Sequence, residues 1–97
     1  MPTFGVTDRF KKDLSDLDFD ERDRFERCVN DKFVPDLING GFRAGLRVKI
    51  VQGTGFVYEM TWAPDGRATW QYGDDLHPGV PHVIWRRVGT HDIFRSP

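Results

Sequence analysis

Residues 56–72, FVYEMTWAPDGRATWQY, decide the fold of this chain. Apolar and polar side chains alternate on both sides of the central turn Ala63-Pro64-Asp65-Gly66, and a period of two is typical of strands buried on one face. Proline, aspartate and glycine favour a tight turn, so the two runs predict neighbouring antiparallel strands. Residues 46–51 alternate in the same way and precede the turn Gly53-Thr54-Gly55. The sequence therefore predicts a three-stranded meander with one apolar and one polar face.

The residues before the meander have a helical period. Thr3–Val6 predicts a short strand, and Thr7 or Asp8 can cap a first helix. Asp20 can cap a second helix, which we expect Pro35 to kink or end. Two such helices are the natural cover for the apolar face of the meander. Their apolar positions are Phe10, Leu14 and Leu17 in the first helix, and Phe25, Val29, Phe33 and Leu37 in the second, with Cys28 beside them.

After the meander, residues 73–81 have the composition of a loop, and residues 82–88 predict a last strand. The pattern leaves the orientation of this strand open. One orientation places Trp85 and Arg87 on the polar face, whereas the other buries Trp85 and presents Arg86 instead.

Length and composition fit a single domain over residues 1–97. The chain is 38% hydrophobic and 30% charged, as in soluble globular proteins, and it contains no repeat or linker. We expect an α+β domain. Its small antiparallel β-sheet consists of the meander, the last strand and the short N-terminal strand, and two N-terminal helices pack on one face.

Charge and cysteine content narrow the function classes. A net charge of -1 disfavours a nucleic-acid partner, because such partners usually select a basic domain. The charge is unevenly distributed, since acidic residues concentrate in residues 8–36 while residues 42–72 carry four basic residues against two acidic ones. A lone Cys28 excludes an internal disulfide and a multi-cysteine zinc site. No run is apolar enough to span a membrane and no secretion signal is present, so we expect a cytoplasmic protein.

The polar face of the meander is the first candidate site. Cross-strand pairing brings its rows of side chains close together. They are Arg47, Lys49, Glu59, Thr61, Arg67, Thr69 and Gln71. Two interpretations stay open: a groove with mixed donors, or a solvated sheet face on which Glu59 pairs with Lys49 or Arg67.

The second candidate is the run Arg86-Arg87-Val88-Gly89-Thr90-His91-Asp92-Ile93-Phe94, at the end of the last strand. Arginine offers forked donors to phosphate oxygens, histidine titrates near neutral pH, and an exposed ring can stack on a nucleobase. The set suits cleavage of RNA without a metal. A base takes the proton of a ribose 2′-hydroxyl, that oxygen attacks the adjacent phosphorus, and an acid protonates the leaving oxygen. The simpler alternative is a structured tail whose His91 caps another element.

On the catalytic hypothesis, His91 is the acid or base, and Arg87 and Arg67 stabilise charge in the transition state. Glu59 is a second candidate for proton transfer, although a structural ion pair is its simpler role. The candidates for substrate binding, of which the aromatic ones would stack on a base, are Arg47, Lys49, Trp85, Arg86, Phe94 and Tyr72.

A metal site is a weaker alternative. Asp74, Asp75, His77, His82 and His91 include suitable ligand types for a divalent ion, but their spacing matches no compact metal motif. We therefore expect no metal and no cofactor.

The order of elements resembles the RelE/ParE toxin superfamily over essentially the whole chain. Arg47-Val48-Lys49, followed by Tyr58-Glu59-Met60 and Gly66-Arg67-Ala68-Thr69-Trp70, is similar to the paired central strands of that superfamily, with an arginine opening the next strand. Arg87-Val88-Gly89-Thr90-His91-Asp92-Ile93-Phe94 resembles the Arg-x-Gly-x-His-x-x-Leu-Phe ending of its YafQ-like branch. The sequence departs from the branch at Thr61, where the branch has another histidine, and at Phe94, which comes one residue sooner.

The resemblance implies a type II toxin: a ribosome-dependent endoribonuclease that cuts mRNA in the decoding site and is neutralised by a cognate antitoxin. It implies that Arg87 and His91 take the transition-state and proton-transfer roles. It also implies that Phe94 contacts the substrate and that Arg67 is a further phosphate ligand. Two alternatives stay open. One is a non-catalytic binding module for a protein partner, which the pI of about 6.3 favours, and the other is a gyrase-directed toxin, a type that generally lacks the terminal histidine motif.

Overall fold

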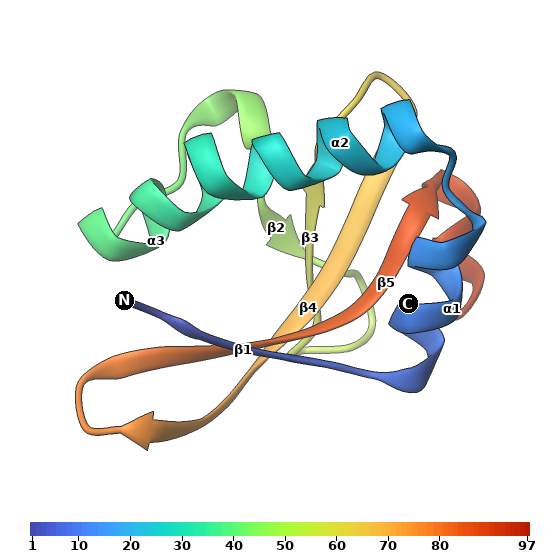
Figure 1. Ribbon diagram of the computed structural model, residues 1–97. Coiled ribbons are helices and arrows are strands. Elements are labelled where there is room, and N and C mark those ends of the chain that lie inside the picture. Colours follow the sequence, from blue (N-terminus) through green and yellow to red (C-terminus); the bar gives the residue numbers. More distant parts are fainter.

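Five strands form one sheet in a computed structural model that describes residues 1–97. The order across the sheet is β1-β5-β4-β3-β2 (Figure 1). The strands are β1 (Thr3–Val6), β2 (Lys49–Ile50), β3 (Tyr58–Thr61), β4 (Gly66–His77) and β5 (Val80–Thr90). Strands β2 to β5 pair antiparallel, whereas β1 pairs parallel to β5, so the sheet is mixed.

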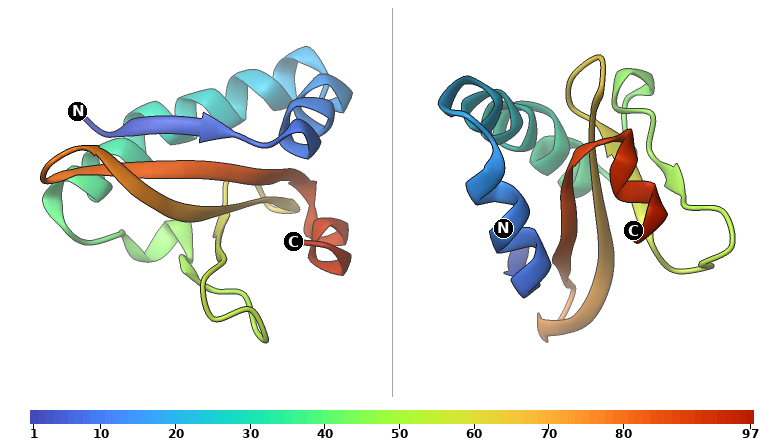
Figure 2. Two further views of the ribbon diagram at one scale, coloured as in Figure 1. Left: turned by 90° about the horizontal axis from the view of Figure 1, so that it is seen from below. Right: turned by 90° about the vertical axis from the view of Figure 1, so that its right-hand side faces the viewer.

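Helices cover one face of the sheet, and a short 3₁₀ helix lies on the opposite face (Figure 2). The covering helices are α1 (Asp8–Asp16), α2 (Phe19–Cys28) and α3 (Val34–Asn39). The 3₁₀ helix, η3 (His91–Arg95), follows β5 directly and packs Ile93 against Gly89. We call the face that carries η3 the open face. The α+β architecture expected from the sequence is confirmed.

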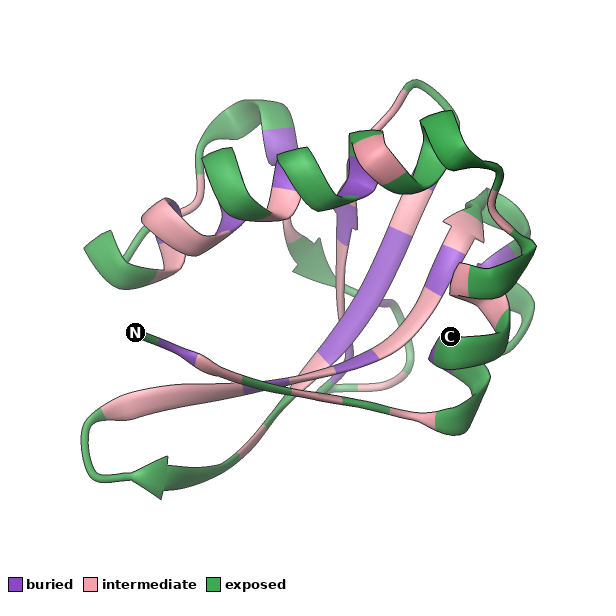
Figure 3. Cartoon of the chain, viewed as in Figure 1, coloured by how far each residue is buried: buried purple, intermediate pink, exposed green.

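The two helical stripes face the sheet as predicted. Phe10 from α1, and Phe25 and Phe33 from the α2 side, are buried in a core whose largest fully buried residue is Trp70. Aromatic rings fill this core, and Trp85 contacts the rings of all four of these residues. The buried residues of β4 lie in its first half, between Gly66 and Trp70, and those of β5 lie between Val83 and Val88 (Figure 3). None of the helices is long and apolar enough to cross a membrane.

Helix caps differ partly from the prediction. Thr7 caps α1 as expected, because its hydroxyl accepts the Phe10 N–H. The second helix is capped by Asp18 instead of Asp20: Asp18 accepts the Glu21 N–H, and Glu21 accepts the Asp18 N–H in return. This reciprocal pair satisfies the N–H groups of both Asp18 and Glu21. A cap at Asp20, two residues later, would leave them without these partners.

Of the two outcomes predicted for Pro35, a kink or an end of the second helix, the end is wrong, because helical structure continues through it to Asn39. A π-helical turn, η1 (Val29–Phe33), precedes the proline, and the Val34 N–H reaches the Val29 carbonyl. The wider turn gives the proline ring room where an α-helical turn would place a carbonyl, and Pro35 then stands in the first turn of α3, where no N–H is needed. The helix ends at Gly40, whose φ of 84° is left-handed.

The segment 73–81, predicted as a loop, is instead an extended hairpin. Strand β4 continues to His77 and β5 starts at Val80, with Gly79 at φ 77° in the turn. The residues near the tip are exposed on both faces, so their sequence shows no alternation of apolar and polar side chains. The segment was therefore predicted as a loop. Backbone pairing with β5 extends the strand in spite of that composition.

The segment 46–51 is mostly not a strand. A 3₁₀ turn, η2 (Ala44–Leu46), precedes Arg47, which adopts a left-handed φ of 52°, and only Lys49–Ile50 pairs with β3. The left-handed conformation of Arg47 interrupts the extended backbone just after the buried Leu46. An alternating pattern of apolar and polar residues gives no sign of such a conformation.

A bulge in β5 resolves the orientation that the sequence left open. Thr69 pairs with Arg87 while Trp70 pairs with Trp85, so Arg86 has no partner residue in β4. The extra residue reverses the alternation. Trp85 and Val88 are therefore both buried, and both arginines stay out of the core.

Candidate functional site

Three strands form a basic groove on the open face. Arg47, Lys49, Glu59, Thr61 and Arg67 line a hollow of about 440 Å³, with Val48 as the one apolar residue. Lys49 lies directly opposite Glu59, and its Nζ is 3.9 Å from Glu59 Oε1. Three cationic side chains thus face one carboxylate. The groove and the Glu59–Lys49 pair, predicted as alternatives, are both present.

Two residues predicted for this face lie outside the groove. Thr69 is fully buried and its hydroxyl has no hydrogen-bond partner, while Gln71 accepts a hydrogen bond from Arg86. Neither side chain is therefore available to a ligand in the groove.

His91 pairs with a carboxylate that the sequence did not single out. Its Nδ1 is 2.9 Å from Asp65 Oδ1, and its Nε2 is 3.8 Å from Asp92 Oδ1. The His91 side chain is 68% exposed, so the ring is accessible. The hydrogen bond from His91 lowers the pKa of Asp65, and the charge of Arg67 contributes in the same direction. Asp65 had appeared only as a turn residue between β3 and β4.

Arg67 lies at the same turn. Its Nη1 donates to the carbonyl oxygens of Ala63, Pro64 and Gly66, at 3.4, 3.3 and 2.9 Å. These bonds hold the Arg67 guanidinium against the turn that contains Asp65. The turn therefore brings together the imidazole of His91 from η3 and the guanidinium of Arg67 from β4, and Arg67 also lines the basic groove.

Arg87 does not lie in the basic groove. Its Nε donates to Asp13 Oδ2 at 2.6 Å and its Nη1 to the Ser96 carbonyl at 2.8 Å. The two side chains of the Arg87–Asp13 pair are 12% and 11% exposed. Arg86 donates to Gln71 and to the Pro97 carbonyl, and its guanidinium lies 5.6 Å from the centre of the Phe56 ring.

Two of the three aromatic residues predicted to stack on a base are placed elsewhere. Trp85 is 5% exposed in the core, because the bulge turns it toward the helices, so the prediction of a stacking surface there is wrong. Tyr72 is exposed but lies edge-on to Tyr58, which contacts the core. Phe94 is half-buried in η3, on the open face.

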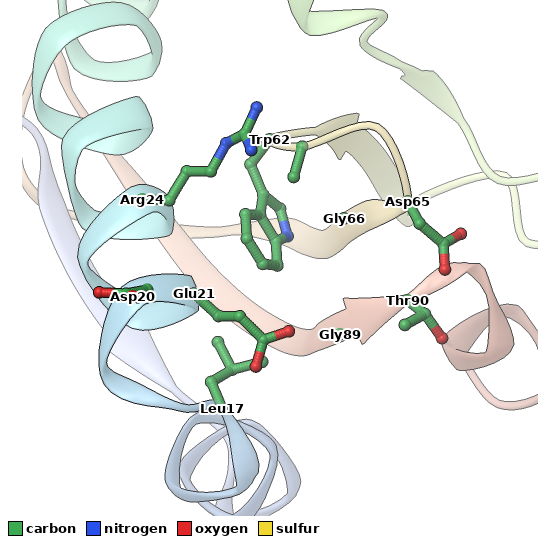
Figure 4. Close-up of a pocket in the computed structure, with 10 residues that line it drawn as sticks. Leu17, Asp20, Glu21, Arg24, Trp62, Asp65, Gly66, Gly89 and Thr90 are labelled. Atoms are coloured by element: carbon green, nitrogen blue, oxygen red, sulfur yellow. The ribbon is translucent and has the colours of Figure 1, made fainter.

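A further pocket borders the His91–Asp65 pair on the helical side (Figure 4). It holds about 350 Å³ between the α1–α2 corner, the β3–β4 turn and the end of β5. Trp62 and Glu21 extend into it, with Asp65 and Thr90 on the opposite side. Its charged residues are three carboxylates, Asp20, Glu21 and Asp65, against one guanidinium, Arg24. The lining of this pocket therefore carries an excess of negative charge.

The histidines and aspartates considered as metal ligands do not assemble. The structure contains no group of three or more His, Cys, Asp or Glu side chains placed to hold a metal ion. His82 instead pairs with Thr3, Nδ1 to Oγ1 at 2.7 Å, and ties β5 to β1.

Comparisons with known proteins support the fold. No protein-family model matches the sequence. No curated protein matches it either. Among solved structures, the chain is similar to the conserved hypothetical protein HP0894 from Helicobacter pylori (17% identity over 95% of this chain and 97% of that chain, TM-score 0.64). It is also similar to YafQ from E. coli (15%, 95% and 96%, TM-score 0.60) and to a chain of the RelB–RelE antitoxin–toxin complex from Methanococcus jannaschii (16%, 95% and 95%, TM-score 0.63).

At these identities the likeness is one of fold, and it extends over nearly the full length of every chain compared. It confirms the architecture implied by the sequence resemblance: this chain has the fold of the RelE/YafQ-like toxins.

Proposed function

We propose that this protein is the toxin of a type II toxin–antitoxin system and cleaves mRNA on the ribosome by metal-independent acid–base catalysis. One observation carries the proposal: the His91–Asp65 pair and Arg67 meet at one turn, at the end of a groove with three cationic side chains. This supplies a proton-transfer group, a charge stabiliser and a track for a polyanion within one surface.

The reaction follows from these groups. A base removes the proton of a ribose 2′-hydroxyl, O2′ attacks the adjacent phosphorus, and the bond to the 5′ oxygen breaks while an acid protonates that oxygen, leaving a 2′,3′-cyclic phosphate and a 5′-hydroxyl. His91 transfers a proton through Nε2, since Nδ1 is bound to Asp65. Arg67 neutralises the charge on the phosphoryl oxygens, and Arg47 and Lys49 hold the flanking backbone.

The remaining predicted residues enter the proposal with less central roles. Phe94, on η3, supplies the stacking surface beside His91. Arg86 and Arg87 act on a phosphate away from the scissile one, because they line a different cavity from Arg67. Glu59 stays an ion-pair partner of Lys49.

The partners follow from the same proposal. A structurally similar RelE chain was solved in complex with its antitoxin, and we propose that a cognate antitoxin likewise neutralises this chain. The substrate is mRNA in the ribosomal decoding site, which places the protein in the cytoplasm.

Induced expression with primer extension on a reporter transcript tests the function. We expect growth arrest and in-frame cuts with the wild-type chain, and loss of both in His91→Ala. In Arg67→Gln, cleavage should fall by on the order of a hundredfold, as when one donor to a charged transition state is removed. His77→Ala is the matched control, because His77 lies exposed at the hairpin tip. A folded His91→Ala variant that still cuts the transcript would overturn the proposal.

The acidic pocket favours one alternative, a non-catalytic module that binds a protein partner. Its three carboxylates beside Trp62 suit a cationic side chain of such a partner. Harmless expression of the wild-type chain, with no transcript cleavage, decides for this alternative.

A further inference from the structure

The loop between β2 and β3 presents an aromatic ring to solvent. This loop, residues 51–57, lies on the same side of the sheet as η3 (Figure 2). Phe56, near its end, is 54% exposed. The residue belongs neither to the core nor to the partly buried residues packed against the core. Burial therefore does not explain why an aromatic ring stands at this position.

The loop that carries Phe56 is held by internal hydrogen bonds. Thr54 Oγ1 donates to the Val51 carbonyl at 2.8 Å and accepts the Val57 N–H at 3.1 Å. The Val51 N–H donates to the Val57 carbonyl at 2.7 Å. Both valines are buried, so they anchor the two ends of the loop. Phe56 directly precedes one of these anchors, and its backbone position is therefore defined.

A guanidinium covers one side of the Phe56 ring. Arg86 lies 5.6 Å from the ring centre, within the roughly 6 Å over which a cation and an aromatic ring attract each other. Arg86 is itself fixed, because it donates to Gln71 and to the Pro97 carbonyl. No other aromatic ring of the chain packs on Phe56. Because more than half of the residue stays exposed, the oriented ring can take a second flat group.

The loop joins two strands that line the basic groove. Lys49 in β2 and Glu59 in β3 both belong to the groove and lie opposite each other. Glu59 follows Phe56 by three residues. A fully extended chain spans at most about 3.6 Å per residue, so the Cα atoms of Phe56 and Glu59 are at most about 11 Å apart. A cationic groove with an exposed ring beside it is the combination by which proteins bind single-stranded nucleic acids.

We propose that Phe56 stacks on a nucleobase of the RNA, at a nucleotide that flanks the cleavage site. The proposal rests on the proposed RNA substrate, and it adds a binding residue that was not predicted from the sequence. Phe56 is separate from Phe94, which belongs to η3. Every nucleobase has a flat face, so this contact raises the affinity for single-stranded RNA without selecting a sequence.

Removal of the ring tests the proposal. Phe56→Ala should weaken binding of a cleavage-resistant single-stranded oligonucleotide on the order of tenfold, as the loss of one stacked base does. In transcript cleavage, KM should rise while kcat stays unchanged, because the ring does not touch the reacting atoms. Phe56→Trp should bind like the wild-type chain, whereas Phe56→Leu, which is apolar but has no ring, should bind like Phe56→Ala. Phe56 lies outside the core, so these variants keep the fold.

Phe19→Ala is the matched control, because Phe19 is 83% exposed on α2, away from the open face. Phe56→Trp also reports stacking directly. The three native tryptophans are at most 8% exposed, so quenching of fluorescence by the oligonucleotide comes mainly from the new indole. An oligonucleotide with the same backbone but no bases separates stacking from charge. It should quench little and should bind the wild-type chain and Phe56→Ala equally.

The proposal is overturned if Phe56→Ala binds the oligonucleotide as tightly as the wild-type chain, or if Phe19→Ala weakens binding to the same extent. An equal loss with the base-free oligonucleotide assigns the effect to charge and also overturns it. If RNA affinity is unchanged but the antitoxin no longer neutralises Phe56→Ala, the ring is a protein contact instead. Base stacking without transcript cleavage contradicts only the ribonuclease proposal, whereas cleavage with the same KM in both chains contradicts only this one.

Discussion

At the scale of the residue, Asp65 determines how His91 presents its ring. The carboxylate holds Nδ1 at 2.9 Å, so a neutral ring carries its proton on Nδ1 and leaves Nε2 for a substrate. Nothing in the composition of the turn Ala63-Pro64-Asp65-Gly66 distinguishes this role from that of an ordinary turn aspartate, because the contact joins residues 26 positions apart.

Replacing Asp65 with Asn tests that role. An amide binds imidazole less strongly than a carboxylate does and leaves the ring free to turn, so Asp65→Asn should slow transcript cleavage about tenfold or more. The measurement is single-turnover cleavage, together with the ¹⁵N spectrum of the His91 ring. Asp92→Asn is the control, since that carboxylate is 3.8 Å from Nε2 and highly exposed. Equal rates for the two variants would remove Asp65 from the site.

Gly66 shows how tightly the same turn packs on the core. A Cβ at this position would stand 2.6 Å from Trp62 Cε2 and 2.8 Å from Ala63 Cβ. We expect Gly66→Ala to lower the free energy of unfolding by roughly 1–3 kcal/mol, as overpacking does. Urea denaturation measures it, with Gly41→Ala as the control because nothing lies within 4 Å of that Cβ. Similar midpoints for the two variants contradict the expectation.

At the scale of the element, one ion pair joins α1 to β5. Asp13 accepts from Arg87 and from the Val88 N–H, and both charged side chains are nearly buried. Asp13→Asn leaves Arg87 without its partner and should cost about 3 kcal/mol of unfolding free energy, at the lower end for a broken buried pair. Asp16→Asn, which removes an exposed pair with Lys12, should cost less than about 1 kcal/mol. A loss in Asp13→Asn no larger than in this control, measured in urea, refutes the assignment.

The segment after α3 is held by a second pair, Asp36–Arg43. Hydrogen bonds from Arg43 lower the pKa of Asp36 from 3.8 to about 2. Because the folded pKa lies below the unfolded one, the stabilisation is present above pH 3.8 and is lost as the pH falls toward 2. The urea midpoint should therefore drop across this window in the wild-type chain and drop less in Asp36→Asn. Parallel curves for the two proteins would show that the pair does not contribute.

The predictability of the elements followed the burial of their side chains. The strand Thr3–Val6 and the helical stripes were predicted correctly, and the stripes are visible in the sequence because Phe10, Phe25 and Phe33 recur at helical spacing on a buried face. The hairpin turn at Gly79 and the left-handed conformation of Arg47 were not predicted, because both depend on backbone pairing and geometry more than on the pattern of side chains. The residues that line the basic groove were predicted from the sequence, because pairing between neighbouring strands places their side chains in adjoining rows. The positions of Arg86 and Arg87 were not predicted, because the alternating pattern of a strand does not show where a bulge lies.

At the scale of the whole molecule, the two hollows on either side of the β3–β4 turn differ in charge. The basic groove lies on the open face, while the acidic pocket lies on the helical side. A net charge of -1 is therefore compatible with a local track for a polyanion.

Salt dependence of RNA binding tests that track. Contact of three cations with a single strand predicts a slope of about -2 in a plot of log K against log salt, at roughly 0.7 per phosphate. Arg47→Gln should reduce the slope by about 0.7, whereas Lys12→Gln, on the exposed surface of α1, should leave it unchanged. A slope near zero for the wild-type chain excludes the groove as the RNA track.

The parallel pairing of β1 with β5 has a consequence for biosynthesis. Thr3 and His82, which are hydrogen-bonded across this pair, are separated by 79 positions. The edge of the sheet cannot form until residues 82–85 have left the ribosome, and most of the aromatic core waits with it, because Trp85 belongs to the same strand. We expect the nascent polypeptide to stay unfolded through most of its translation and to fold only at a late stage.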